Sequence, residues 1–165
     1  MFKYIGGICA VALLAGAFFI TTGCAANKTF TVGKDIQLKD VQEFYFTESA
    51  STNPPYYQRY LFSNKTGKQE FYHEKREGNE WPLREKHITV HGTIALTDKQ
   101  WQLFFDLIKD GEVTKRVEDP RGGGRGPWLY LYWSKDKGKY QVFKFANLQK
   151  QKDFEALCLA LKGTK

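Results

Sequence analysis

The sequence has too little cysteine for its fold to depend on disulfide bonds. Its 165 residues include three cysteines, at positions 9, 24 and 158, and two of these lie within the first 24 residues. Cys158 is the only thiol in the polar part of the chain, so it has no intrachain partner there. A domain formed by this part must be held by packing. Four Trp, nine Tyr and 13 Phe supply the side chains for a core.

The sequence also lacks the motifs of common enzyme chemistry. It contains no Gly-x-Ser-x-Gly for a nucleophilic serine. Thr66-Gly67-Lys68 is followed by Gln69 and has no glycine five residues earlier, so it is not a phosphate-binding loop. His87 and His91 lie on one predicted strand, about 13 Å apart and too far to share a zinc ion. We expect no catalytic residues, no metal and no cofactor. A hydrolase assembled from distant carboxylates or imidazoles is a lesser alternative.

Only one long run without charge occurs, and it lies at the N-terminus. Lys3 precedes an almost wholly apolar segment from Ile5 to Ile20, which ends in Thr21-Thr22-Gly23-Cys24. A basic start, an apolar run and a small-residue end are typical of an export signal that is removed from the mature chain. The last four residues resemble the lipobox of bacterial lipoproteins. In that family a peptidase cuts before the cysteine, whose sulfur carries a diacylglyceryl group.

This resemblance implies that Cys24 is the lipid attachment site and that acyl chains anchor the protein in the cell envelope. Ala25, which follows the cysteine, implies the outer membrane in a cell that has two membranes. The alternatives are an uncleaved membrane anchor over Ile5 to Ala26 and an ordinary signal cleaved near Ala25-Ala26. The expected organisation is a signal peptide at 1–23, a lipidated tether at 24–34 and a single domain at 35–165.

Alternation of apolar and polar residues predicts six strands in this domain. In the clearest case Ile88, Val90, Ile94 and Leu96 face one way. The stretch from Asn64 to Gly67 is typical of a hairpin loop. The predicted strands are Val41–Glu48, Tyr56–Ser63, Lys68–Glu77, His87–Leu96, Trp128–Trp133 and Tyr140–Phe145.

Two amphipathic helices complete the predicted domain. Thr97-x-x-Gln100 is a capping box that begins the first helix, and Gly111 ends it. The second helix runs from about Gln149 to Lys162. We therefore predict an α+β fold, with an antiparallel sheet of about five or six strands and both helices on one face. The apolar stripes that face the sheet are Trp101, Phe104, Phe105 and Ile108 in the first helix and Phe154, Leu157, Cys158 and Leu161 in the second.

The chain is basic, with 25 Lys and Arg against 18 Asp and Glu. Eight lysines and three acids lie between Lys135 and the end, a surplus that would attract an anionic envelope polymer. Residues 121–127 resemble segments that bind single-stranded nucleic acid, but an exported domain does not meet nucleic acid. The long connection over 113–127 is expected to be a mobile segment without a function of its own. The alternative is a contact site on this segment, for which Arg121, Arg125 and the neighbouring Trp128 are the candidate partner-contact residues.

These observations favour a membrane-anchored envelope lipoprotein with a non-enzymatic binding or structural role. Its expected partners are the membrane, through the lipid, and either an anionic envelope polymer or another envelope protein, but not nucleic acid. The alternative is an inhibitor or assembly accessory that grips another envelope protein with the arm from Arg121 to Trp128. The domain also resembles, loosely, small envelope lipoproteins of uncharacterised function, and this likeness includes no residues beyond the lipobox. The sequence does not specify an oligomeric state.

Overall fold

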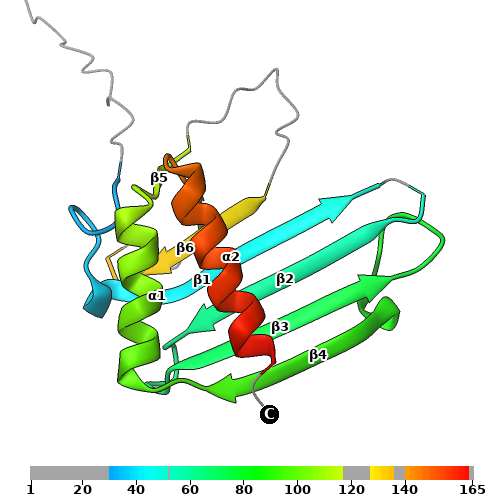
Figure 1. Cartoon of the computed structure of the whole chain (residues 1–165), viewed down its shortest axis with the longest axis horizontal. Coiled ribbons are helices and arrows are strands. Elements are labelled where there is room, and N and C mark those ends of the chain that lie inside the picture. Colours follow the sequence, from blue (N-terminus) through cyan, green and yellow to red (C-terminus); the bar gives the residue numbers. More distant parts are fainter. Residues whose placement is uncertain (1–29, 52, 117–126, 136–139, 164–165) are drawn as a thin grey trace, which may run out of the picture.

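The computed structural model describes residues 30–51, 53–116, 127–135 and 140–163. These residues form one antiparallel sheet with two α-helices on one of its faces (Figure 1). The predicted α+β class is therefore confirmed. Across the sheet the strand order is β4-β3-β2-β1-β6-β7-β5. The elements are η1 (Leu38–Asp40), β1 (Val41–Ala50), β2 (Tyr56–Ser63), β3 (Glu70–Glu77), η2 (Glu85–His87), β4 (Ile88–Ala95), α1 (Asp98–Asp110), β5 (Thr114–Lys115), β6 (Trp128–Trp133), β7 (Gln141–Lys144) and α2 (Leu148–Lys162).

Strand alternation gives the sheet one apolar face. In the register of β1 with β2, Phe44 lies opposite Phe62 and Phe46 lies opposite Tyr60. Phe62 in turn lies opposite Phe71 of β3. Because successive residues of a strand point to opposite faces, these aromatic side chains all project to the same side. All five are buried.

Both helices pack on this apolar face through phenylalanine rings. The ring of Phe104 in α1 stacks on that of Phe62, with centroids 4.1 Å apart and planes 7° apart. Phe154 in α2 lies 5.7 Å from Phe62 and 5.6 Å from Phe44. Cys158 of α2 is fully buried in the same core, as expected for a small apolar side chain. Burial raises the pKa of its thiol, which keeps the group unreactive.

Local caps fix where the helices begin. The Thr97 hydroxyl accepts a hydrogen bond from the Gln100 backbone N–H at 3.3 Å, and the Gln100 side chain accepts one from the Thr97 N–H at 2.9 Å. The predicted capping box of α1 is thus confirmed. Asn147 caps α2, because its side-chain oxygen accepts from the backbone N–H groups of Gln149 and Lys150.

The sheet has seven strands among the described residues rather than the predicted five or six. The additional strand, β5, consists of Thr114 and Lys115 and pairs with β7. Two residues are too few to show any alternation, so the sequence places them in the connection over 113–127. Val113, at the start of that connection, is fully buried.

The packed domain also begins earlier than position 35. The Val32 N–H donates to the Val113 carbonyl at 2.9 Å, and the Lys115 N–H donates to the Phe30 carbonyl at 2.8 Å. The Val32 side chain is only 2 % exposed. The sequence assigns Phe30 to Lys34 to the tether because this short segment has no period, yet in the structure it lies against β5 and the core.

One residue predicted to face the core is solvent-exposed instead. Val90 in β4 is 40 % exposed, whereas Ile94 on the same face packs against the core. The reason is that the helices cover only one end of the sheet, and β2, β3 and β4 extend beyond them (Figure 1). Alternation predicts the face on which a side chain lies but not how far the covering layer reaches.

Candidate functional site

The face of the sheet opposite the helices carries the most distinctive group of polar and aromatic side chains. We call this the open face, since neither α1 nor α2 lies over it. Strand alternation and register place these side chains together. The open face bears the aromatic residues Tyr45, Tyr57, Tyr72, Trp128, Tyr130 and Tyr132, the cations Arg59 and Arg76, and the buried polar residues Glu43, Thr47 and Glu74.

The pairing of β1 with β6 gathers the tyrosines in the middle of this face. Tyr45 lies directly opposite Tyr130. Tyr140, immediately before β7, places its ring 5.4 Å from that of Tyr45 and 5.6 Å from that of Tyr132. The Tyr45 and Tyr140 rings meet edge to face, at 75°, an arrangement that aromatic pairs favour. Tyr140 remains 46 % exposed, so the cluster presents aromatic surface to its surroundings.

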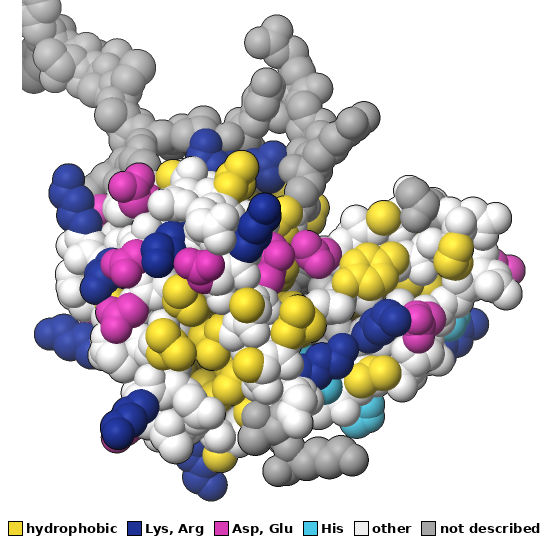
Figure 2. Space-filling view, viewed as in Figure 1, with side chains coloured by type: hydrophobic (Ala, Val, Ile, Leu, Met, Phe, Trp, Pro, Cys, Tyr) yellow, Lys and Arg dark blue, Asp and Glu magenta, His cyan; other side chains and the backbone are white. Residues whose placement is uncertain are grey.

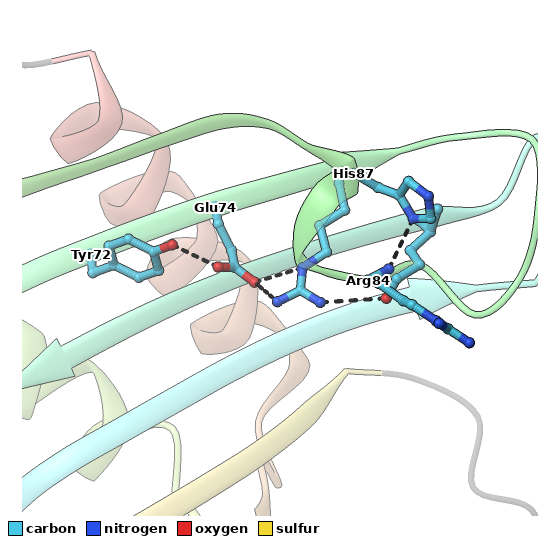
Figure 3. A network of polar contacts seen from close by, with 6 residues as sticks. Tyr72, Glu74, Arg84 and His87 are labelled. Atoms are coloured by element: carbon cyan, nitrogen blue, oxygen red, sulfur yellow. Dashed lines mark hydrogen bonds and ion pairs between the residues drawn. The ribbon is translucent and has the colours of Figure 1, made fainter.

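A buried carboxylate fixes the β3 side of the open face (Figure 3). Glu74 is 5 % exposed, and its Oε2 accepts a hydrogen bond from the Tyr72 hydroxyl at 2.6 Å. Its Oε1 accepts from Arg76 Nε at 3.0 Å and from Arg76 Nη2 at 2.7 Å. Burial, together with the bond to Glu74, raises the pKa of Tyr72 to about 12. Both carboxylate oxygens of Glu74 are thus engaged within the fold.

Arg76 also connects this network to the segment between β3 and β4. Its Nη1 donates to the Leu83 carbonyl at 3.4 Å, and the Leu83 side chain is buried. Nearby, His87 Nδ1 accepts a hydrogen bond from the Arg84 backbone N–H at 2.9 Å (Figure 3). These bonds hold the segment against one corner of the open face.

A second buried carboxylate lies on the β1 side. Glu43 is 7 % exposed, accepts a hydrogen bond from the Tyr140 hydroxyl and has Lys65 Nζ 3.6 Å away. Burial, with the bond to Glu43, raises the pKa of Tyr140. Glu43 therefore positions the exposed Tyr140 ring, and the positive charge of Lys65 offsets its own negative charge.

A shallow pocket of about 350 Å³ lies between these two carboxylates. The Arg59 guanidinium carbon lies 5.5 Å from the ring centroid of Tyr45 and 5.4 Å from that of Tyr57. These distances are within the range of a cation–π interaction. We call this cavity the Arg59 pocket; its lining residues are Tyr45, Thr47, Arg59, Tyr130 and Tyr140.

Of the three residues predicted for partner contact, the structure describes Trp128, and this residue lies on the open face. Trp128 begins β6 on the open face, opposite Thr47. It is half-buried, and the Arg116 guanidinium lies 4.7 Å from its ring centroid. The predicted strand Trp128–Trp133 is confirmed as β6, and its pairing with β1 leaves Trp128 half-buried in the sheet rather than fully exposed. Arg121, Arg125 and the predicted lipid-attachment residue Cys24 lie outside the described residues.

The histidines do not form a joint site. His91 is exposed on β4 and His87 belongs to η2. His73 lies on the helix-bearing side, and burial followed by the positive charges of Lys162 and His91 lowers the pKa of its imidazole. Within the ranges that the structure describes, no three His, Cys, Asp or Glu side chains lie together in a way that could hold a metal ion.

The helix-bearing face carries a mixture of basic and acidic side chains. In Figure 2, basic and acidic side chains alternate over this face, and apolar side chains gather between them. Lys109 lies 3.0 Å from Asp106 on α1, and Lys150 lies 3.4 Å from Asp153 on α2. The basic surplus predicted for the last helix is thus interrupted by acids. This arrangement gives an anionic polymer no continuous basic track on the described part of α2.

Comparisons with protein-family models, with curated proteins and with solved structures found no match for this chain. Among the described helices, none combines the length and the apolar character that crossing a membrane requires.

Proposed function

We propose that the protein is a lipid-anchored binding protein of the bacterial envelope that presents the open face of its sheet to another envelope protein. The main support for this proposal is the amino-acid composition of the open face. Tyr, Trp and Arg are the residue types enriched at the centres of protein interfaces, where a few of them dominate the binding energy. The open face concentrates these types, whereas the helix-bearing face has the mixed charges of an ordinary solvated surface.

The geometry of the open face supports binding rather than mere exposure of aromatic rings. The hydrogen bonds from Tyr72 and Arg76 to Glu74, and from Tyr140 to Glu43, hold these side chains in place before a partner arrives. Side chains that are already ordered lose less conformational entropy on binding. A partner would therefore meet a rigid surface of rings.

The proposed anchor is a diacylglyceryl group on Cys24, after removal of residues 1–23. Six residue steps separate Cys24 from Phe30, a span of at most about 20 Å. The domain would therefore lie close to the bilayer, with the end that carries Phe30 and β5 nearest to it (Figure 1). The open face would then point sideways along the membrane surface, toward neighbouring envelope proteins. In a cell with two membranes, we place the anchor in the outer membrane.

The first experiment tests the anchor. The intact mass of protein extracted from membranes should correspond to a chain that begins at Cys24 and carries two or three acyl chains. Cys24→Ser should abolish the added mass and release the protein from the membrane fraction. A native chain that begins elsewhere, or that retains residues 1–23 without lipid, would contradict the anchor.

The second experiment tests the open face. A photo-reactive amino acid at position 130 should cross-link one specific envelope protein, whereas the same group at Leu103 on α1 should not. Leu103 is a matched control because it is 48 % exposed on the opposite side of the domain. If the two positions give the same products, the open face is not the binding surface.

The open face also bears on the predicted alternative, an inhibitor or assembly accessory of another envelope protein. Such a role needs the same docking surface, so the identity of the cross-linked partner decides between it and a structural role. A partner that is an enzyme, with activity reduced in the complex, would assign inhibition.

A further inference from the structure

Arg59 differs from Arg76, the other cation of the open face, because its side chain has no hydrogen-bond acceptor or ion-pair partner within the described part of the chain. Its Nε is buried and makes no hydrogen bond there. Arg76 is bonded to Glu74, and Lys65 pairs with Glu43. Buried polar atoms of folded proteins are normally hydrogen-bonded, so the Arg59 Nε is an exception among the described residues.

The nearest carboxylate by register does not fill this role. Glu74 lies directly opposite Arg59 in the pairing of β2 with β3, but its two oxygens accept hydrogen bonds from Tyr72 and Arg76. Glu74, the carboxylate nearest to Arg59 in the strand register, is therefore paired with Arg76 instead. The Arg59 guanidinium is left between the rings of Tyr45 and Tyr57, at the pocket wall.

The pocket suits a single small anionic group. A guanidinium binds a carboxylate through two parallel N–H···O bonds. The ring of Tyr130 and the exposed ring of Tyr140 can cover the apolar stem that carries the carboxylate. A volume of about 350 Å³ accommodates one or two amino-acid side chains rather than a folded element.

The number of cations favours a protein ligand over a polyanion. A polymer with repeated negative groups needs several uncompensated cations in a row, whereas Arg76 and Lys65 are paired with carboxylates and Arg116, stacked on Trp128, does not line the pocket. One unpaired cation among aromatic rings matches one acidic side chain within an apolar protein surface. Such a pair is desolvated by the surrounding contacts and contributes to specificity.

From these observations we infer that the Arg59 pocket binds the carboxylate of one Asp or Glu side chain on the partner protein, with Arg59 as its anchor. The inference rests on the proposed function and specifies the chemistry of the partner. Binding forms a charge-assisted ion pair in which Nη atoms of Arg59 donate to the two carboxylate oxygens. No covalent step is involved.

The test follows the arginine side-chain N–H signals by NMR in the lipidated protein extracted from membranes into detergent micelles. The probe is N-acetyl-glutamate N-methylamide, and the matched neutral probe is N-acetyl-glutamine N-methylamide. We expect the Arg59 signal, assigned by its absence in Arg59→Lys, to shift with a dissociation constant on the order of 10 mM for the charged probe. Binding of the neutral probe should be about tenfold weaker, because the ion pair is lost.

Matched variants separate the pocket from other arginines. Arg59→Gln should abolish the response of the neighbouring Tyr45 and Tyr130 signals, whereas Arg84→Gln, at an exposed position, should leave it unchanged. Arg59→Gln should also lower the cross-linking yield from position 130 about tenfold. Unchanged backbone spectra would show that each variant is folded.

Three results would overturn the inference. These are equal affinity for the charged and neutral probes, no shift of the Arg59 signal, and tighter binding of glucuronate or inorganic phosphate than of the glutamate probe. Tighter binding of glucuronate would assign an acidic sugar, and tighter binding of phosphate would assign a phosphorylated ligand. If cross-linking from position 130 persists while Arg59 shows no carboxylate preference, the proposed function stands and only the binding role of Arg59 is wrong. If position 130 yields no specific product, the proposed function fails independently.

Discussion

The two faces of the sheet use aromatic side chains for opposite purposes. On the helix-bearing face, Phe44, Phe62 and Phe71 are fully buried and contact phenylalanine rings of α1 or α2 or of one another. On the open face the rings belong to Tyr and Trp, stand half-exposed and rest on buried carboxylates. The hydroxyl groups account for the difference, because a tyrosine can bury its ring edge and still hydrogen-bond at the surface. Stability should therefore reside mainly in the first face and binding in the second.

The largest expected effect comes from the helix-bearing face. Phe62→Ala removes a buried ring that stacks on Phe104 and should lower the free energy of unfolding by about 3–5 kcal/mol. Urea denaturation measures this change. The control is Leu61→Ala, one residue away but half-buried on the open face, which should cost about 1 kcal/mol. Equal losses for the two variants would remove the distinction between the faces.

The next effect tests the ionic network beneath the open face. Arg76→Met leaves Glu74 buried without its cation and should destabilise the fold by about 3 kcal/mol. The double variant Glu74→Leu, Arg76→Met should recover most of this loss, because both charges are then absent.

The neighbouring residue supplies the control for this network. Lys75 points to the other side of β3 and pairs with the exposed Glu77 at 2.6 Å, so Lys75→Met should cost less than about 1 kcal/mol. A loss for Arg76→Met as small as this would show that the network does not support the open face.

A smaller effect on stability should accompany a large effect on binding at Tyr130. Tyr130→Ser removes a half-buried ring from the Arg59 pocket and should cost about 1 kcal/mol of folding free energy. Complex formation with the cross-linked partner should nevertheless be lost, as measured by co-purification from solubilised membranes. Leu103→Ser on α1 should leave co-purification intact. Binding that survives in Tyr130→Ser would restrict the interface to another part of the molecule.

The smallest effect concerns His73, a half-buried residue of β3 on the helix-bearing side. His73 has a lowered pKa, from burial and from the charges of Lys162 and His91, so the unfolded chain binds a proton more readily than the folded one. The folded state should therefore lose some stability as pH falls below about 6.5, where this imidazole is protonated in the unfolded chain before it is in the folded one. His73→Gln should flatten the stability profile between pH 7.5 and 5. A profile of unchanged slope would mean that His73 is not responsible.

The sequence predicts the helix-bearing face well because its signals are local. The capping box at Thr97 and Gln100, the phenylalanine stripes and the alternation in β2 and β6 each depend on a few neighbouring residues. The exceptions, β5 and Val90, depend instead on what lies opposite them in space. A two-residue strand has no period, and the reach of the helices over β4 follows from tertiary packing.

The open face is harder to predict because distant residues form it. The pairing of Tyr45 with Tyr130 joins positions far apart in the sequence, and the isolation of Arg59 depends on which cation Glu74 binds. A partial signal does exist in the segment from Trp128 to Trp133, where Leu129 and Leu131 alternate with tyrosines. Tyrosines in the polar phase of a strand indicate an aromatic surface, but their partners come only from the register.

The N-terminal attachment of the domain has a mechanical consequence. Phe30 and Val32 are joined to the rest of the fold by backbone hydrogen bonds to Lys115 and Val113, beside the two-residue strand β5. Tension applied through the residues before Phe30 would act first on this short border of the sheet, where the Phe30 ring also rests on Trp133 with centroids 5.4 Å apart. Val32 belongs to the same core as Phe62, so core packing as well as these hydrogen bonds would resist a pull on this end of the domain.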